Sequence, residues 1–392
     1  MRKLITALLL AIVSPLAFAI VDMKSANYAE TWSDLTVPGI GYDLRVSRTY
    51  NSRSLFNGIF GFGWCSDYET KIDVTTEGNL RLTECGGGME ITYTPKNFNP
   101  DKIDQTVAQI IAEIKKKRTD LKPDYIENLE REMKTNDFMR EEFGRRMNIV
   151  GKAEDGVVYL ANGREAENIT LKKGVYKRTL ADGTYQLFEA STGHMSHMYD
   201  RNQNHLKLSW EKDLLVSVSD NLGRKLTIKY NPSNKKVSEI VGPNRMSSKY
   251  KYSGEDLTEV VDARKDQYKY QYDEVHNLTR IELPDRKFKE LTYNKDKDWV
   301  VTFRNTKGCI ETYDYQVSKD DPKNHFWSNV VKKCNNKVTN KSKYEFFHKN
   351  RPGGQGVYLA RVRTEVNDEV TDIVYHDTFG KPLTIVRDKE KT

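Results

Sequence analysis

The chain is 392 residues long and carries a formal net charge of +7 at pH 7, with 30% charged and 37% hydrophobic residues. The lysines alternate with other residues and do not cluster, so the weak positive bias favours a solvated surface and argues against a nucleic-acid ligand. Beyond the N-terminal region no apolar run is long enough to cross a bilayer, so no membrane span is expected.

Residues 1–19 are typical of a secretory signal peptide. Arg2 and Lys3 precede an apolar run at residues 4–13, and Ala17-Phe18-Ala19 supplies small residues where a signal peptidase would cut. We expect cleavage after Ala19. No cysteine follows that point, so a lipid anchor is not expected. The mature chain is therefore expected to be exported, to the periplasm, the cell surface or the medium.

Residues 20–98 predict β structure with tight turns, because apolar and polar residues alternate at 42–46, 80–82 and 91–93. Residues 99–149 break this pattern. Pro100 and Asp101 open a helical pattern, Pro123 begins a second one, and a third short helix follows. We interpret 99–149 as a helical insertion packed between β segments, with a partner-binding arm as the alternative.

Residues 150–209 predict β hairpins, because glycines recur there at roughly ten-residue spacing. An aromatic repeat then marks 210–318, with separations of 20, 22, 20, 21 and 20 residues between Trp210, Tyr230, Tyr252, Tyr272, Tyr293 and Tyr313. Residues 319–392 are interpreted as divergent C-terminal β repeats. A fixed period of this length indicates one supersecondary unit stacked many times.

Each unit of the repeat holds two short strands and two turns, so one unit is one hairpin. A lone hairpin cannot bury its apolar face, so adjacent units must pair edge to edge. The predicted fold class is mainly β: a long curved antiparallel sheet of repeated hairpins with an inserted α-helical hairpin.

Four cysteines in an oxidising compartment allow three pairings. Turn-like residues lie between Cys65 and Cys85 and again between Cys309 and Cys334. We therefore predict two local cross-strand disulfides, Cys65–Cys85 and Cys309–Cys334. A zinc site is not expected, because the chain has no C-x-x-C pair.

The repeat units resemble the YD repeats of the Rhs family, named for a tyrosine-aspartate pair at the turn. The pair is present at Tyr199-Asp200, Tyr272-Asp273 and Tyr313-Asp314, and in softened form at Tyr230-Asn231 and Tyr293-Asn294. A second segment is similar to the opening of Rhs proteins, and its family-like residues are Arg48, Tyr50, Asn51, Gly61, Gly63 and Trp64.

The resemblance implies a β shell. Members of the family coil the repeat sheet into a hollow cocoon, often around a C-terminal toxin, and teneurin-like relatives use such shells for contact at the cell surface. This chain has few repeats, and it lacks a D-P-x-G-type segment before a toxin. Self-cleavage and toxin carriage are therefore not expected.

The sequence marks no catalytic or metal site. In His194-Met195-Ser196-His197 the two histidines are three apart, which on a strand points them to opposite faces. Acidic residues are frequent, but no pair is singled out for glycoside hydrolysis. No nucleophile elbow, zinc-protease or phosphate-loop spacing occurs. We predict no enzyme activity, no metal and no cofactor.

One tyrosine-rich face is the candidate binding surface. It holds Tyr250, Tyr252, Tyr268, Tyr270 and Tyr272, with lysine and glutamine on the reverse face. These rings either pack in ladders across neighbouring strands or form a stacking platform for sugars or peptide.

The function predicted from the sequence is an exported, non-enzymatic YD-repeat protein that acts as a structural or binding module. The alternatives are a component of a toxin-delivery or contact-dependent competition system, and a carbohydrate-active enzyme. The predicted partners are a protein or glycan ligand, and a homo- or hetero-association through an unfinished sheet edge.

Overall fold

The structure is a computed structural model that describes residues 20–84, 89–161, 164, 166–350, 357–387 and 390–391. The predicted signal peptide and Cys85 lie outside the described residues. No helix in the described part of the chain combines the length and apolarity needed to cross a membrane.

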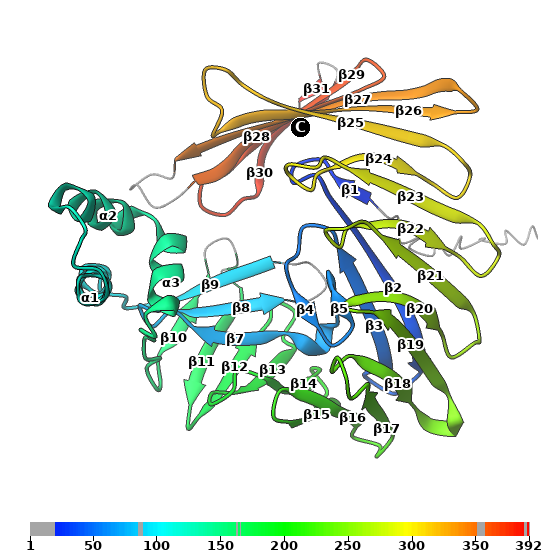
Figure 1. Cartoon of the computed structure of the whole chain (residues 1–392), viewed down its shortest axis with the longest axis horizontal. Helices are drawn as coiled ribbons and strands as arrows, with labels where there is room; N and C mark the ends of the chain where they lie inside the picture. Colours follow the sequence, from blue (N-terminus) through cyan, green and yellow to red (C-terminus); the bar gives the residue numbers. More distant parts are fainter. Residues whose placement is uncertain are drawn as a thin grey trace, which may run out of the picture.

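A curved antiparallel sheet, which we call the wall, makes up most of the molecule (Figure 1). Its strands pair in chain order from first to last, so the mainly β, curved-sheet prediction is confirmed. The first part of the wall comprises β7 (Lys71–Val74), β8 (Leu80–Glu84), β9 (Met89–Pro95), β10 (Val158–Leu160), β11 (Asn168–Lys172), β12 (Val175–Thr179), β13 (Tyr185–Glu189) and β14 (Met195–Tyr199).

The wall continues through the aromatic repeat and the C-terminal strands. These are β15 (His205–Glu211), β16 (Leu214–Asp220), β17 (Lys225–Tyr230), β18 (Val237–Val241), β19 (Ser247–Ser253), β20 (Asp256–Val261), β21 (Gln267–Tyr272), β22 (Leu278–Glu282), β23 (Phe288–Tyr293), β24 (Val300–Arg304), β25 (Ile310–Val317), β26 (His325–Cys334), β27 (Lys337–Asn350), β28 (Val357–Val366), β29 (Glu369–Tyr375), β30 (Pro382–Arg387) and β31 (Glu390–Lys391). A short 3-10 turn, η2 (Pro243–Arg245), interrupts the loop before β19.

The wall meets itself at one place only among the described residues. A single bridge pairs Lys71 with His194, and the amide of Ile72 donates to the carbonyl of Gly193 at 3.0 Å. This contact curls β7–β14 into a ring. No pairing joins the last described strand to the first, so the sheet as a whole stays open.

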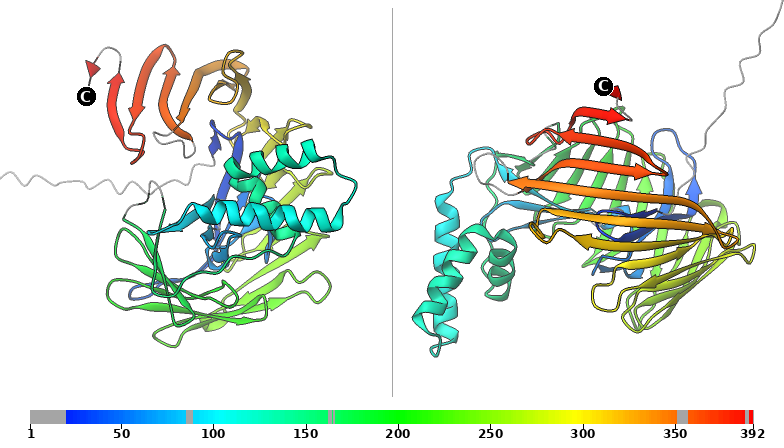
Figure 2. Two further views of the ribbon diagram at one scale, coloured as in Figure 1. Left: turned by 90° about the vertical axis from the view of Figure 1, so that its left-hand side faces the viewer. Right: turned by 90° about the horizontal axis from the view of Figure 1, so that it is seen from above.

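The N-terminal segment, residues 20–70, lies inside the curve of the wall (Figures 1 and 2). We call it the plug. Its main sheet has the order β1-β2-β3-β6, beside a two-stranded β4–β5 pair and a 3-10 turn. The elements are β1 (Ile20–Asp22), β2 (Asn27–Val37), β3 (Leu44–Asn51), β4 (Asn57–Gly58), β5 (Gly61–Phe62), β6 (Trp64–Cys65) and η1 (Asp67–Glu69). Plug and wall share one hydrophobic core.

Three helices stand outside the wall, between β9 and β10 (Figure 2). They are α1 (Asp101–Lys117), α2 (Pro123–Thr135) and α3 (Asp137–Arg146), with a small core of their own. Residues of α3 fasten them to the β7–β8 turn: Arg140 is ion-paired with Glu77, and Glu141 accepts from the amide of Thr76 at 3.0 Å. The predicted helical insertion is confirmed.

A β-bulge accompanies each of five aromatic residues of the repeat. The register shifts at Trp210, Tyr230, Tyr252, Tyr272 and Tyr293. The extra residue lies on the following strand, and when it carries a hydroxyl, as in Ser238, Thr258 and Thr279, the hydroxyl donates to a carbonyl of the aromatic strand. Because a bulge bends its strand and increases the local twist, the repeat itself curves the wall.

The side-chain hydroxyl or ring N–H groups of the repeat's aromatic residues join neighbouring hairpins by hydrogen bonds. Four of them donate to the carbonyl fifteen residues earlier: Trp210 to Met195, Tyr230 to Leu215, Tyr272 to Leu257, and Tyr293 to Leu278, at 2.8–2.9 Å. In the last unit Tyr315 makes this bond, to Val300 at 2.8 Å. The structural repeat therefore continues at Tyr315, whereas Tyr313 bonds to Glu311.

Many turns of the wall begin with an aspartate or asparagine, and the hydrogen bonds of the side chain explain why. One carboxylate oxygen of Asp273 accepts from the amides of Val275 and Asn277, at 3.0 and 2.9 Å. Asp200, Asp220 and Asp262 repeat the arrangement. A side-chain acceptor of this kind fixes a tight turn by substituting for a backbone carbonyl.

Removing single tyrosine hydroxyls should distinguish units in which the hydroxyl bonds to the previous hairpin from units in which it does not. Tyr230→Phe should cost about 1 kcal/mol of unfolding free energy, because the Leu215 carbonyl loses its donor. Tyr252→Phe should be neutral or stabilising, because the described residues give its buried hydroxyl no hydrogen-bond partner. Urea unfolding followed by circular dichroism measures both, and an equal loss in the two variants would contradict this account.

One of the two predicted disulfides is confirmed. Cys309 and Cys334 are bonded across the β25–β26 hairpin, with their Cα atoms 4.3 Å apart. Cys65 is buried in the plug on β6. The partner predicted for it, Cys85, lies outside the described residues, so this pairing stays a prediction.

Candidate functional site

The seam between plug and wall is the most elaborate polar site in the described structure. At its centre the Arg48 guanidinium of β3 donates from Nε to Asp34 Oδ2 at 2.7 Å, and the two side chains are 0% and 1% exposed. The wall closes the cluster from the other side. Arg48 donates to the Tyr270 hydroxyl at 2.6 Å, and the Tyr250 hydroxyl donates to Asp34 at 3.0 Å.

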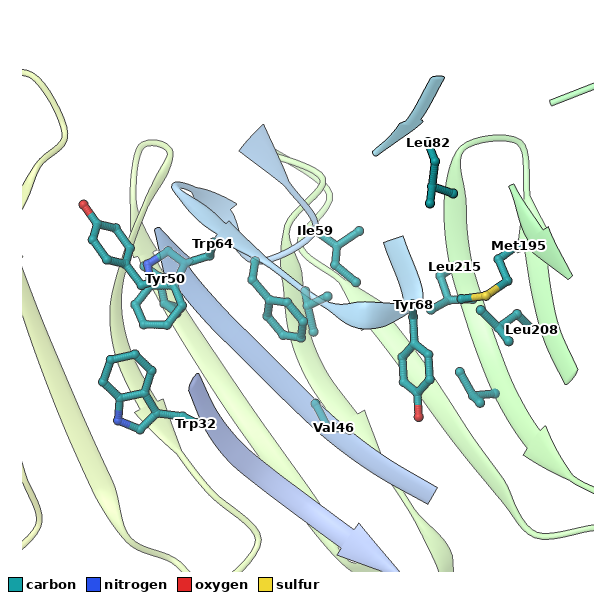
Figure 3. Packing of buried hydrophobic residues seen from close by; sticks show 14 of the residues in the cluster. Trp32, Val46, Tyr50, Ile59, Trp64, Tyr68, Leu82, Met195, Leu208 and Leu215 are labelled. Carbon is teal, nitrogen blue, oxygen red and sulfur yellow. The ribbon is translucent and has the colours of Figure 1, made fainter. Parts of the chain in front are cut away.

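Aromatic rings enclose this ion pair. The guanidinium carbon of Arg48 lies 4.5 Å from the ring centre of Trp64, 5.1 Å from Tyr270 and 5.4 Å from Trp32. Figure 3 shows Trp32, Tyr50 and Trp64 gathered at one end of the plug. Burial raises the pKa of Tyr270, which Arg48 partly counteracts, so this hydroxyl stays protonated and can donate or accept. The cluster can hold charge away from water but presents no exposed reactive group.

Backbone bonds join plug and wall along the same seam. Wall amides donate inward, from Val237 to the Ile59 carbonyl at 2.9 Å and from Val300 to the Ala26 carbonyl at 3.2 Å. The amide of Leu278 donates to the Tyr50 hydroxyl at 2.9 Å. These three wall residues occupy the same place, opposite the bulged tyrosine of their hairpins. The plug thus supplies acceptors to amides of the bulged units.

The family-like motif residues lie at this seam. Trp64 donates from its ring nitrogen to the Tyr272 hydroxyl at 2.8 Å, and Asn51 accepts from the Arg53 amide within the plug. Gly61 and Gly63 have φ values of +98° and +74°. A Cβ at Gly61 would lie 2.4 Å from the wall carbonyl of Glu255. Glycine is therefore required where the plug touches the wall.

The tyrosine-rich face predicted from the sequence faces the plug. Tyr250 and Tyr270 are buried, at 5% and 3% exposure, and Tyr252, Tyr268 and Tyr272 are half-buried. The Tyr250 ring centre lies 5.2 Å from that of Phe60, and the Tyr270 centre 5.1 Å from that of Trp64. In this structure the chain's own rings occupy the surface that was proposed as a ligand platform.

Glu69 is a half-buried acid of the plug close to the wall. Its carboxylate accepts from the amides of Ile59 and Ser66, at 2.7 and 2.9 Å. Burial raises the pKa of Glu69 to about 7, against the lowering effect of these two donors and of Lys236.

This pKa shift predicts a pH-dependent stability. Because the unfolded chain ionises Glu69 near 4.5 and the folded chain near about 7, folding takes up a proton between these values. Stability should fall as the pH rises through that window, by at most about 1.4 kcal/mol per pH unit. Urea unfolding of wild type and Glu69→Gln from pH 4.5 to 7.5 tests this, and identical pH slopes would contradict it.

A cavity of about 240 Å³ opens where the plug meets β14 and β15. The plug contributes Tyr42, Asp43, Arg45 and Asp67 among others, and the wall contributes Met198 and Leu206. Although Asp67 is exposed, desolvation by the surrounding cavity walls raises its pKa, and the charge of Arg45 partly offsets this.

The histidines of the His194–His197 stretch lie against aromatic rings. His194 stacks on Trp210 with ring centres 4.2 Å apart, and His197 stacks on Tyr199 at 5.8 Å. Across the described residues no group of three or more histidine, cysteine or acidic side chains is placed to hold a metal ion.

Sequence reasoning did not single out Asp34, Glu69 or the cavity residues. One signal could have indicated Asp34: it is an acid in a strand beside the large apolar residues Trp32 and Leu35, which are buried. A buried acid requires a cation or several donors. The Arg48 of the motif is that cation.

Comparison with known proteins gives a family match at the N-terminal end. Residues 19–93 match a family model described as a domain of unknown function, DUF6531. This region contains the plug and the first wall strands. No curated protein matches the sequence.

Solved structures of toxin complexes show a distant likeness. TcdB2-TccC3 without its hypervariable C-terminal region has 10% identity over 62% of this chain and 18% of that chain, with a TM-score of 0.25. TcdB2-TccC3-Cdc42 has 11% identity over 62% and 18%, with a TM-score of 0.24. The Photorhabdus luminescens Tc holotoxin pore has 10% identity over 64% and 20%, with a TM-score of 0.20. The chain spans about a fifth of the length of these structures.

Proposed function

We propose that the chain is an exported, non-enzymatic module of the Rhs/YD-repeat type, with a structural and binding role at the cell surface or in the periplasm. The observation that carries this proposal is the filled concave face: the wall closes over the chain's own plug through the Arg48–Asp34 pair and the tyrosines around it. A face that is already packed and hydrogen-bonded serves to hold a shape.

The repeat chemistry supports the YD-type assignment. In Tyr272-Asp273 the tyrosine-aspartate pair occurs at a turn. The tyrosine hydroxyl bonds its hairpin to the previous one, and the aspartate fixes the turn. The motif resembling the opening of Rhs proteins falls in the plug, which the family match also covers.

The outer face of the wall is charged, which supports a protein that works in an aqueous compartment. Oppositely charged side chains pair across neighbouring strands, as in Lys229–Glu239, Lys251–Glu259 and Arg280–Glu290, at 2.6–2.8 Å. Such pairs add little stability when exposed, but they give the outer face a charged surface that favours contact with water.

Export is tested by fusing residues 1–25 to a reporter enzyme that is active only outside the cytoplasm. The proposal expects activity for the native segment and none for a variant in which Leu8 and Leu9 are replaced by arginine. Reporter activity that is the same for both would contradict export through this segment.

The non-enzymatic role is tested with a panel of chromogenic glycosides. We expect no turnover above that of heat-denatured protein. Turnover that disappears in Asp67→Asn, which changes a carboxylate of the cavity between plug and wall, would overturn the proposal in favour of a carbohydrate-active enzyme. The proposed association through a sheet edge is tested separately by light scattering, where a monomer at high concentration would contradict it.

A further inference from the structure

The cavity between plug and wall gathers polar groups whose bonding capacity is not used up. No hydrogen bond or ion pair within the described residues is found for the carboxylate of Asp67, the guanidinium of Arg45 or the hydroxyl of Tyr42, although all three line the cavity. Most other charged side chains near the seam are paired, for example Arg48 with Asp34 and Lys236 with Glu255. The cavity is the exception.

The rest of the lining is suited to a small polar ligand. Ser47 and Ser66 are buried residues of its lining, at 7% and 3% exposure. Met198, Leu206 and the ring of Tyr68 give it an apolar part. Tyr68 and Asp43 are already held in place, because the Tyr68 hydroxyl donates to the Arg45 carbonyl at 2.7 Å and Asp43 accepts from the Gly39 amide at 2.9 Å. These contacts set the lining before any ligand arrives.

The mixture of groups defines the ligand class. An apolar patch, rings with polar tips, and donors and acceptors of both charge signs suit a molecule with many hydroxyls and a weakly apolar face. Two carboxylates against one guanidinium leave no excess of positive charge for an anion. Convergent polar groups in a mainly apolar concavity are the usual form of a small-molecule site. The volume of about 240 Å³ lies below the usual range for pockets that hold drug-sized ligands, which favours one sugar ring over a chain.

We propose that this cavity binds one residue of a carbohydrate, as a neutral or amino sugar. The inference rests on the proposed function, since it names the ligand class of an exported binding module. It places that ligand in the cavity where the plug meets β14 and β15, rather than on the tyrosine-rich face. Asp67 and Arg45 form hydrogen bonds with the hydroxyls of the sugar ring. Tyr42 contacts the sugar with its hydroxyl and its ring.

Titration of the purified full chain with monosaccharides tests the site, with glucose, galactose and N-acetylglucosamine as probes, followed by calorimetry or ligand-observed NMR. We expect saturable binding of at least one sugar at about millimolar concentration, as for a site that takes one ring. Asp67→Ala and Arg45→Ala should each weaken it about tenfold or more, because each removes charged hydrogen bonds. Asp213→Ala is the matched control, since its side chain is 94% exposed on the wall and it does not line the cavity.

The outcomes separate cleanly. No binding of any probe, or binding that both cavity variants leave unchanged, overturns the proposal. Binding of L-lysine in place of the sugars also overturns it, because the ligand would then be a cation drawn by the two carboxylates. None of these results bears on export or on the plug–wall seam, so the proposed function fails only by its own tests. Asp67 and Arg45 are exposed and outside the buried seam, so their variants are expected to fold.

Discussion

Arg48→Met should destabilise the protein by about 3–5 kcal/mol. The substitution leaves the Asp34 carboxylate, 1% exposed, buried without its cation. It also removes the donor of the Tyr270 hydroxyl and the charge held among Trp32, Trp64 and Tyr270. The loss is measured as the change in unfolding free energy in urea.

Two companion variants make the Arg48 result specific. Lys251→Met removes an equally charged side chain from the outer face, 71% exposed, and should cost no more than about 1 kcal/mol. The double variant Arg48→Met with Asp34→Leu should be less destabilised than the two single changes added together, because no unpaired charge remains. Strict additivity, or a loss in Lys251→Met as large as in Arg48→Met, would contradict a buried ion pair at the seam.

Trp64→Ala should cost about 3–5 kcal/mol, the usual range for a fully buried tryptophan. Trp64 is 0% exposed and contacts the rings of Trp32, Tyr50 and Tyr270, at centre distances of 5.1–5.3 Å. Its loss leaves a cavity at the seam and frees the Tyr272 hydroxyl from one donor. Circular dichroism is the suitable probe, because the substitution alters the fluorescence.

Trp327→Ala is the matched control for size. Trp327 is a half-buried residue of β26, and the next residue, Ser328, is the one that points inward and contacts the plug at Met23. Removing an outward-facing tryptophan should cost about 1 kcal/mol. Equal losses in Trp64→Ala and Trp327→Ala would show that the seam contributes no more than the outer face.

The repeat could be predicted from the sequence because its cause is local. The recurring aromatic residue, the turn after it and the two strands follow from spacing and residue type, and the structure places a bulge at each predicted anchor from Trp210 to Tyr293. The last anchor was assigned wrongly. Tyr313 and Tyr315 share a strand face, but Tyr315 donates to the Val300 carbonyl whereas Tyr313 donates to Glu311. The period alone could not show that difference.

The site was less predictable, because its parts come from distant segments. Arg48 and Trp64 were singled out through a family-like motif, but nothing indicated that the first β region would lie inside the wall. Asp34 and Tyr250 are separated by 216 positions in the chain, and Leu278 and Tyr50 by 228. No local pattern records which strand will face which over such separations, so neither the seam nor the cavity beside it could be foreseen.

Hydrogen exchange at single amides tests most directly whether plug and wall form one folded body. The amides of Val237, Ala263 and Val300 donate to plug carbonyls, and that of Leu278 donates to the Tyr50 hydroxyl. If the plug is a permanent part of the fold, these four amides should exchange as slowly as ladder amides in the neighbouring strands, near the rate set by global unfolding. Exchange at the rate of an open loop, with the ladder still protected, would show that the plug leaves the wall and would contradict the account.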